Sequence, residues 1–223
     1  MKRVAVQKVA GVKMLKRFRA ISYLAIMLLF LICLGCSEKA ESEEKIAYIS
    51  ANKDSTYTKT FKDLNLGILY DFNFRLTEAD TSWVTFWVEG YQNGEKTDPF
   101  RLIELSYGLN PDKLVEGQLG FGIINPRSEE NASFFLYSPN VYTAPQSIEN
   151  LLNSEGVVGS TWDFAIGEEE LGLGAEETKI LGVYRETGNS VRTYDYQDMN
   201  HITQMINEDK TVLLLKIKVE RKM

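Results

Sequence analysis

Apolar and polar residues alternate along residues 66–76 with a period of two. Large apolar side chains occupy the even positions, and residues that are mostly small or polar occupy the odd ones. Successive side chains of a strand point to opposite faces, so this pattern predicts a β-strand with one buried and one mostly solvated face. The predicted buried set is Leu66, Ile68, Tyr70, Phe72, Phe74 and Leu76, and the solvated set is Gly67, Leu69, Asp71, Asn73 and Arg75.

Short β-rich segments separated by turn residues recur along most of the chain. Trp83–Val88 is rich in aromatic and β-branched residues, and the Asn93-Gly94 pair after it favours a hairpin turn into a partner strand at 100–107. With about ten or eleven such strands, the chain is predicted to be all-β, an antiparallel two-sheet sandwich of immunoglobulin-like or jelly-roll-like type. The other predicted strands are Ile46–Ile49, Tyr57–Phe61, Gln118–Ile124, Ser133–Tyr137, Thr161–Ile166, Thr178–Arg185, Ser190–Tyr194 and Thr211–Val219.

Two short helices are predicted beside the strands. Asp198 is a suitable N-cap, and Met199, Ile202, Met205 and Ile206 follow at a spacing that places them on one helical face. A second helical turn is predicted at residues 147–153. Neither helix is long enough to change the all-β assignment.

Residues 1–36 differ from the rest of the chain in charge and hydropathy. A basic arm over residues 1–20 precedes Ile21–Leu34, fourteen residues without a charge. This run is shorter than the ~20 residues that a membrane-spanning helix needs and has the length of the apolar region of a signal peptide. The sequence Leu34-Gly35-Cys36-Ser37 comes directly after it.

The Gly35-Cys36 pair at the end of the apolar run resembles the lipobox of bacterial lipoproteins. It departs from the usual motif at Cys33, where Leu is common, and at Leu34, where a small or β-branched residue is common. The resemblance implies cleavage before Cys36 and attachment of diacylglycerol and palmitate to this residue. The expected partner is then a lipid bilayer, and the expected location is the extracytoplasmic face of the cell membrane. The alternatives are an uncleaved anchor helix or a helix buried in the core.

The predicted domain organisation has three parts. Residues 1–35 form the lipoprotein signal peptide, residues 36–45 a flexible acidic tether, and residues 46–223 the β-sandwich domain. The tether has no apolar residue larger than Ala before Ile46, as expected for a solvated linker, although an ordered first helix is the alternative. In its general character, the predicted domain at residues 46–223 resembles small β-rich lipoproteins of unknown role from Gram-positive bacteria.

The charge and cysteine content of the predicted mature chain exclude several kinds of partner. Seven of the 25 Lys and Arg lie in residues 1–35, so 18 remain against 31 Asp and Glu, a formal charge of −13. Nucleic acid is therefore not expected to bind this surface. Because both cysteines, Cys33 and Cys36, precede the domain, we expect no disulfide and no cysteine-based metal site in it.

Candidate ligand-binding residues occur on the strand that contains Trp83 and Trp87. Residues at i and i+4 share one face of a strand, and two indoles on one face can form a platform for a sugar ring, although they can equally belong to a sandwich core. Asp71, Glu89 and Glu104 also lie on predicted strands. A carboxylate pair of the kind that glycosidases use therefore remains an alternative.

The remaining candidate chemistry is weak. His201, the only histidine, is predicted to lie away from the apolar face of its helix, and a single histidine excludes a His-rich zinc site. Acidic residues provide oxygen atoms suited to calcium, but their spacing is not that of an EF-hand loop, so we expect solvated turns and no metal or cofactor. These acidic positions are Glu168, Glu169, Glu170, Glu176 and Glu177, and separately Asp195 and Asp198 with Asn200.

Taken together, these patterns favour a membrane-anchored extracytoplasmic lipoprotein with a non-enzymatic binding or assembly module. The expected partner of that module is an unidentified protein or glycan. The alternative is a carbohydrate-binding or carbohydrate-active domain at the cell envelope that uses Trp83 and Trp87.

Overall fold

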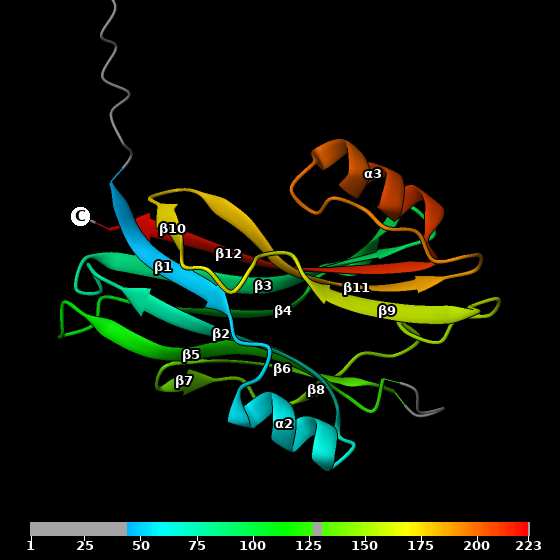
Figure 1. Ribbon diagram of the computed structural model, residues 1–223, viewed down its shortest axis with the longest axis horizontal. Coiled ribbons are helices and arrows are strands. Elements are labelled where there is room, and N and C mark those ends of the chain that lie inside the picture. The colour runs from blue at the N-terminus through cyan, green and yellow to red at the C-terminus, as the bar shows by residue number, and fades with distance from the viewer. Residues whose placement is uncertain (1–43, 127–130, 223) are drawn as a thin grey trace, which may run out of the picture. The chain divides into compact units, whose positions relative to one another are not determined.

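The computed structural model describes residues 44–126 and 131–222, which form two antiparallel β-sheets packed face to face with one helix on the outside of each (Figure 1). The predicted two-sheet sandwich is therefore confirmed. The signal peptide, Cys36 and nearly all of the predicted tether lie outside the described residues. Within these residues, we find no helix that is long and apolar enough to cross a membrane.

The first sheet contains seven strands. Its main order is β10-β1-β2-β5-β6-β7, and β8 also pairs with β6. The strands are β1 (Lys45–Ala51), β2 (Gly67–Leu76), β5 (Val115–Ile124), β6 (Ser133–Ser138), β7 (Val141–Tyr142), β8 (Gln146–Ser147) and β10 (Leu171–Gly174).

The second sheet has five strands in the order β4-β3-β12-β11-β9. Asn93 and Gly94 both have positive φ and connect β3 to β4, which confirms the predicted hairpin. The strands are β3 (Ser82–Gln92), β4 (Glu95–Gly108), β9 (Gly159–Phe164), β11 (Thr178–Thr187) and β12 (Thr211–Arg221).

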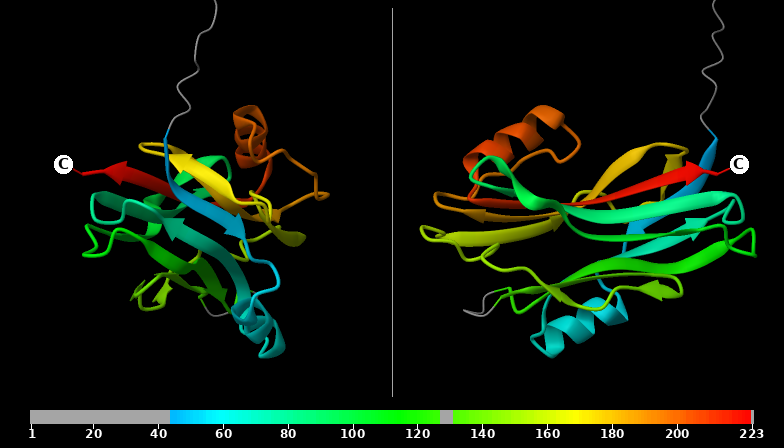
Figure 2. Two further views of the ribbon diagram at one scale, coloured as in Figure 1. Left: turned by 60° about the vertical axis from the view of Figure 1, so that its left-hand side comes forward. Right: turned by 180° about the vertical axis from the view of Figure 1, so that it is seen from behind.

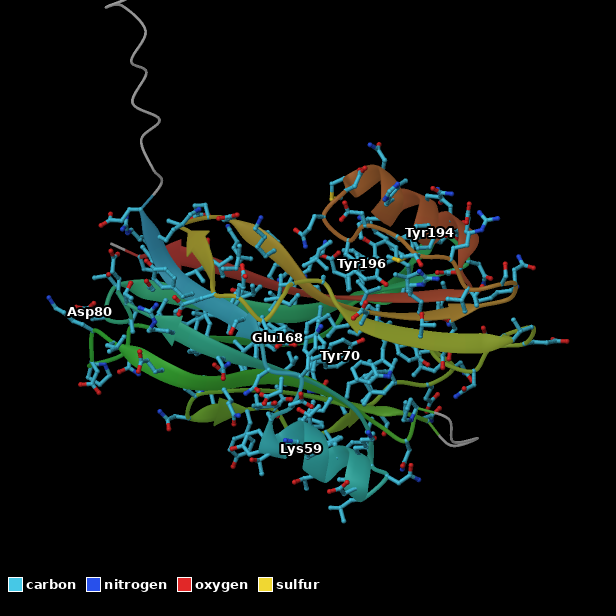
Figure 3. The ribbon with its side chains drawn as sticks, in the orientation of Figure 1. Lys59, Tyr70, Asp80, Glu168, Tyr194 and Tyr196 are labelled. Carbon is cyan, nitrogen blue, oxygen red and sulfur yellow. The ribbon has the colours of Figure 1, made fainter. Side chains whose placement is uncertain are left out.

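The main core lies between the two sheets and consists of aliphatic and aromatic side chains from both. Tyr70 on β2 illustrates how the layers are joined. Its ring packs against Phe121 and Phe164, and its hydroxyl donates a 2.7 Å hydrogen bond to the Val183 carbonyl oxygen on β11. Figure 3 shows Tyr70 between the two layers. A buried phenol needs such an acceptor, because an unpaired hydroxyl in the core would be costly.

Helix α3 (Met199–Glu208) covers part of the outer face of the second sheet, as the two views of Figure 2 also show. Asp198 caps it by accepting a hydrogen bond from Asn200 N–H, as predicted. Ile202 and Met205 are buried in a second cluster that includes Tyr194, and Figure 3 shows Tyr194 and Tyr196 beside this helix. Met199 departs from the prediction, because its side chain is 65% exposed and contributes nothing to this cluster.

Three predicted elements are wrong. Residues 57–61 form part of helix α2 (Thr56–Asp63), because Ser55 provides a helix cap immediately before them. Residues 190–194 pair with no strand in the described chain, and Arg192 and Tyr194 instead bond to Glu208 of α3. Residues 147–153 form β8 and turns, because the left-handed backbone at residues 150 and 153 interrupts any helix.

Candidate functional site

A groove of about 890 Å³ runs between helix α2 and the outer face of strands β6 and β7 of the first sheet. It is the larger of the two main hollows found among the described residues. Aromatic side chains, short aliphatic side chains and hydroxyl groups line it. They belong to Thr56, Tyr57, Thr60, Phe61, Leu66, Leu69, Ile124, Phe135, Tyr137, Ser138, Asn140, Val141, Tyr142, Thr143 and Pro145.

Local sequence signals at both ends hold α2 in place. At the start, the Ser55 side chain accepts a 3.0 Å hydrogen bond from Thr58 N–H. At the end, Asn65 has a φ of 52°, and the N–H groups of Asn65 and Leu66 donate to the carbonyl oxygens of Lys62 and Phe61. This is a Schellman motif, with Asn in the left-handed position that glycine often occupies. The helix therefore begins and ends at fixed residues beside the groove.

Two glycines of β5 make room for two of the rings that line the groove. Gly120 lies between Asp71 on β2 and Tyr137 on β6, and Gly122 lies between Leu69 and Phe135 in the same way. A Cβ atom on Gly120 would come within 2.4 Å of the Tyr137 ring, and one on Gly122 within 2.0 Å of the Phe135 ring. The two aromatic rings of β6 therefore lie across positions that have no side chain, which is a recognised use of glycine within a strand.

The same rings hold the helix against the sheet. Tyr57 of α2 meets Tyr137 edge to face, with ring centroids 6.0 Å apart, and Phe61 meets Phe135 at 5.8 Å. These separations are typical of favourable aromatic pairs. No residue of α2 is itself buried, so the helix rests on the groove and leaves much of it open to solvent.

A buried carboxylate lies directly behind the groove. Asp71 has an exposed fraction of 0%, and its two carboxylate oxygens accept hydrogen bonds from the Tyr137 hydroxyl at 2.6 Å and from Gln118 Nε2 at 3.2 Å. Within the described part of the chain, no ion pair reaches it. Burial raises the pKa of Asp71, while hydrogen bonds from Ser55 and Tyr137 limit the rise.

This carboxylate determines what Tyr137 offers to the groove. A phenol has one proton, and that of Tyr137 is donated to Asp71, so the phenol oxygen presents only lone pairs to a ligand. Burial, together with the neighbouring Asp71, raises the pKa of Tyr137 and keeps it protonated. The groove therefore combines apolar rings with a hydrogen-bond acceptor of fixed orientation.

The predicted solvent exposure of Leu69 and Asp71 on β2 is wrong. Both residues were predicted on the mostly solvated face, but both are buried. Helix α2 and the rings of β6 cover that half of the strand, whereas Asn73, further along the same face, remains exposed. Alternation along one strand does not show whether another element covers its polar face.

The structure places Trp83 and Trp87 together on the outer face of the second sheet, but they do not form an open platform. Trp87 is only 4% exposed, because the Arg101 guanidinium lies 4.5 Å from its ring centroid. Its indole Nε1 donates a 3.0 Å hydrogen bond to Glu89. Trp83 is partly buried. At most one of the two indoles is therefore available to a ligand.

The three strand carboxylates do not converge. Asp71 lies on the outer face of the first sheet, whereas Glu89 and Glu104 are on the second. Glu89 also bonds to Lys216 Nζ at 2.7 Å, and Glu104 pairs with Arg101. Asp71 therefore has no carboxylate partner of the kind that glycoside hydrolysis requires.

The acidic residues of the 168–177 segment are mostly paired with cations. Glu170 bonds to Arg75, and Glu177 bonds to Lys45 and Lys179. Burial tends to raise the pKa of Glu177, but hydrogen bonds from Gly174 N–H and from both lysines outweigh it and lower the pKa to about 2. Across residues 44–126 and 131–222, no group of three or more His, Cys, Asp or Glu side chains is placed to hold a metal ion.

The second acidic cluster and His201 have structural roles. Asp198 caps α3, and Asp195 accepts a hydrogen bond from Gln197 N–H. The imidazole Nδ1 of exposed His201 accepts one from Asp195 N–H, which stabilises the turn before the helix. None of these side chains faces the groove.

The groove was not predicted from the sequence, although the sequence contains one signal for it. Gly120-Phe121-Gly122 matches no phosphate-binding loop, yet two glycines two positions apart within a strand indicate a close approach on one face. Their cross-strand partners become known only when β5 and β6 are paired. No protein-family model matches the chain, and no curated protein or solved structure matches it either.

Proposed function

We propose that this protein is an exported lipoprotein, anchored through acylated Cys36, whose β-sandwich is a non-enzymatic binding module. The ligand-binding site in this proposal is the groove beneath α2. The observation that carries it is the combination of ring-lined walls, a volume of about 890 Å³ and no charged lining residue among those described. Small-molecule sites are commonly concave, mostly apolar and of this size.

The lining indicates the chemistry of the ligand. Tyr57, Phe61, Phe135, Tyr137 and Tyr142 offer apolar surface, so an ionised ligand would lose hydration without gaining a counter-charge. The fixed acceptor at Tyr137 favours a ligand that also has a hydrogen-bond donor. We therefore propose an uncharged, mainly apolar ligand with at least one hydroxyl or amide group.

The position of the groove is compatible with a tether at Cys36. The described chain starts at Glu44, and β1 then extends about 20 Å before α2 begins, given the rise per residue of a strand. A site beyond that strand is separated from the point where the tether joins the domain.

The binding proposal can be tested with Nile red, an uncharged apolar dye. A chain that starts at Ser37 contains all the described strands and helices and has no lipid to compete for the dye. We expect saturable emission enhancement for the wild type and its loss in Thr60→Trp, which places an indole in the groove. Lys59→Trp is the matched control, because Lys59 lies on the same helix but does not line the groove (Figure 3). Equal binding by wild type and Thr60→Trp would contradict the proposal.

The anchor is tested separately by intact mass spectrometry of membrane-bound protein from an expressing bacterium. The proposal predicts a mature chain that starts at Cys36 and carries diacylglycerol. In Cys36→Ala, both the lipid and the cleavage should be lost. An unmodified, uncleaved wild-type chain would refute the lipid anchor and would leave the groove proposal standing.

A further inference from the structure

A second cleft, of about 750 Å³, lies near the end of β5. Leu66 is the one described residue that lines both this cleft and the α2 groove. One side is formed by Asn65 and Asn125, which flank the paired ends of β2 and β5. The opposite side is formed by Ser160, Thr161 and Trp162 of β9. The cleft therefore has residues of both sheets on its walls.

Trp162 is the most accessible of the three tryptophans. Its side chain is 44% exposed, whereas Trp87 is buried and Trp83 is partly buried. The indole meets the rings of Tyr70 and Phe164 edge to face, at centroid distances of 5.6 and 6.3 Å. These contacts hold one side of the ring system in place and leave a rigid apolar surface at the cleft, which reduces the entropy cost of binding a ligand against it.

Two asparagines line the same cleft as this indole. Asn65 and Asn125 both have a φ of 52°, and Asn125 N–H donates a 3.0 Å hydrogen bond to the Leu66 carbonyl oxygen, which holds the two turns together. Asparagine tolerates this left-handed backbone, which accounts for its presence in the turns. Neither side-chain amide is hydrogen-bonded to another described residue. Each therefore has donors and an acceptor available for a ligand.

The described residues that line the cleft are uncharged. None of the described lining residues is Lys or Arg, so this part of the cleft offers no positive charge to a phosphate or a nucleic acid. None of these described residues is Asp or Glu either, so they offer no carboxylate oxygens to calcium. These residues present the indole of Trp162, a few aliphatic side chains, two amides and the hydroxyls of Ser160 and Thr161.

We propose that this cleft binds a neutral saccharide, with one sugar ring stacked on Trp162 and its hydroxyls bonded to Asn65 and Asn125. A sugar ring has an apolar face of C–H groups and a rim of hydroxyls, which matches the two kinds of surface present. This site is distinct from the groove of the proposed function. Carbohydrate binding, first considered for Trp83 and Trp87, is thereby assigned to the exposed indole of β9.

The test is calorimetric titration of the full chain, reconstituted in lipid vesicles, with cellohexaose, N-acetylchitohexaose and mannohexaose at millimolar concentrations. We expect at least one oligosaccharide to bind, and we expect Trp162→Ala to weaken its affinity about tenfold or more. Trp83→Ala is the matched indole control and should bind like the wild type. Thr60→Trp should also leave saccharide affinity unchanged, which separates this proposal from that for the α2 groove.

A second pair of variants guards against unfolding of Trp162→Ala. Asn65→Gly and Asn125→Gly remove the amides but keep a residue that adopts positive φ without strain. Each should weaken binding about fivefold with little change in melting temperature. The proposal is overturned if none of the three oligosaccharides binds the wild type, or if binding persists unchanged in both Asn variants and in Trp162→Ala.

Discussion

Replacing Tyr137 by Phe should show how much the groove depends on the carboxylate behind it. The change removes one hydroxyl and keeps the ring that packs against Tyr57 and Phe135. Asp71 is completely buried, and it accepts hydrogen bonds from Tyr137 at 2.6 Å and from Gln118 at 3.2 Å. The change would remove the shorter of these two bonds. Hydrogen bonds to charged groups contribute about 1.5–3 kcal/mol, so we expect a loss of about 2 kcal/mol in unfolding free energy at pH 7.

This loss should depend on pH with a definite sign. Burial already raises the pKa of Asp71 above its unfolded value, and removal of the Tyr137 donor should raise it further. The protonated carboxyl needs the donor less than the carboxylate does. The difference between wild type and Tyr137→Phe should therefore be largest when Asp71 is ionised, and it should shrink as the pH falls and Asp71 takes up a proton.

Urea unfolding between neutral and acidic pH provides the measurement. Tyr142→Phe is the matched control, because Tyr142 lines the same groove but is 80% exposed, and it should change the unfolding free energy by less than about 0.5 kcal/mol. A double-mutant cycle with Asp71→Asn should give a coupling of about 1 kcal/mol or more. If Tyr137→Phe and Tyr142→Phe had equal effects, or if the cycle showed no coupling, the proposed role of the Tyr137 hydrogen bond would be refuted.

Three further predictions follow from the described contacts. Gly122→Ala would place a Cβ atom 2.0 Å from the Phe135 ring. We therefore expect urea unfolding to show a loss of about 1–3 kcal/mol in unfolding free energy, and we expect weaker Nile red binding. Unchanged dye affinity would show that the position of this ring does not shape the groove. The folded-state pKa of Glu177 lies below its unfolded value, so its stabilisation is complete above about pH 5 and disappears as the pH falls toward 2. Glu177→Gln should accordingly reduce the slope of stability against pH in that window, which acid-dependent thermal melting will detect, and a slope equal to that of the wild type would argue against the pairing. Asp209→Ala would remove the carboxylate that lies 2.8 Å from the buried Arg185 guanidinium. The expected loss of unfolding free energy, measured by chemical denaturation, is about 3–5 kcal/mol. A loss below about 1 kcal/mol would show that water or another group compensates the charge.

The predicted strands agree well with the structure where the signal lies within a single strand or hairpin. The alternation in 66–76, the β-rich run at 83–88 and the Asn93-Gly94 turn all correspond to observed elements. The Asp198 cap likewise marks the start of α3. Hydrophobic period, turn geometry and capping depend on residues close together in sequence, so they can be recognised without knowledge of the fold.

Segments where two local signals compete were predicted less well. Residues 57–61 contain aromatic and β-branched side chains suited to a strand, yet Ser55 and Asn65 bracket them with a helix cap and a left-handed end. The capped helix also allows Tyr57 and Phe61 to pack on the rings of β6. Tertiary contacts and helix caps together outweigh the intrinsic preference of aromatic and β-branched residues for strands.

Neither candidate site could be derived from residue patterns along the chain. Trp83 and Trp87 share a face, as their spacing predicts, but the exposure of Trp87 depends on Arg101, which reaches it from the neighbouring strand. Trp162 has no comparable sequence signal, because its exposure results from its place on an edge strand facing the turns at Asn65 and Asn125.

The sequence by itself determined the all-β class, the hairpin turn and the capped helix α3, and it predicts the lipid anchor at Cys36. Only the tertiary structure decided which faces are covered and which remain open. Asp71 is buried because α2 and the rings of β6 cover its side of the first sheet, and the groove exists because Gly120 and Gly122 leave room for those rings. Such features depend on residues far apart in sequence that meet only through strand pairing and packing, and no local pattern encodes those meetings.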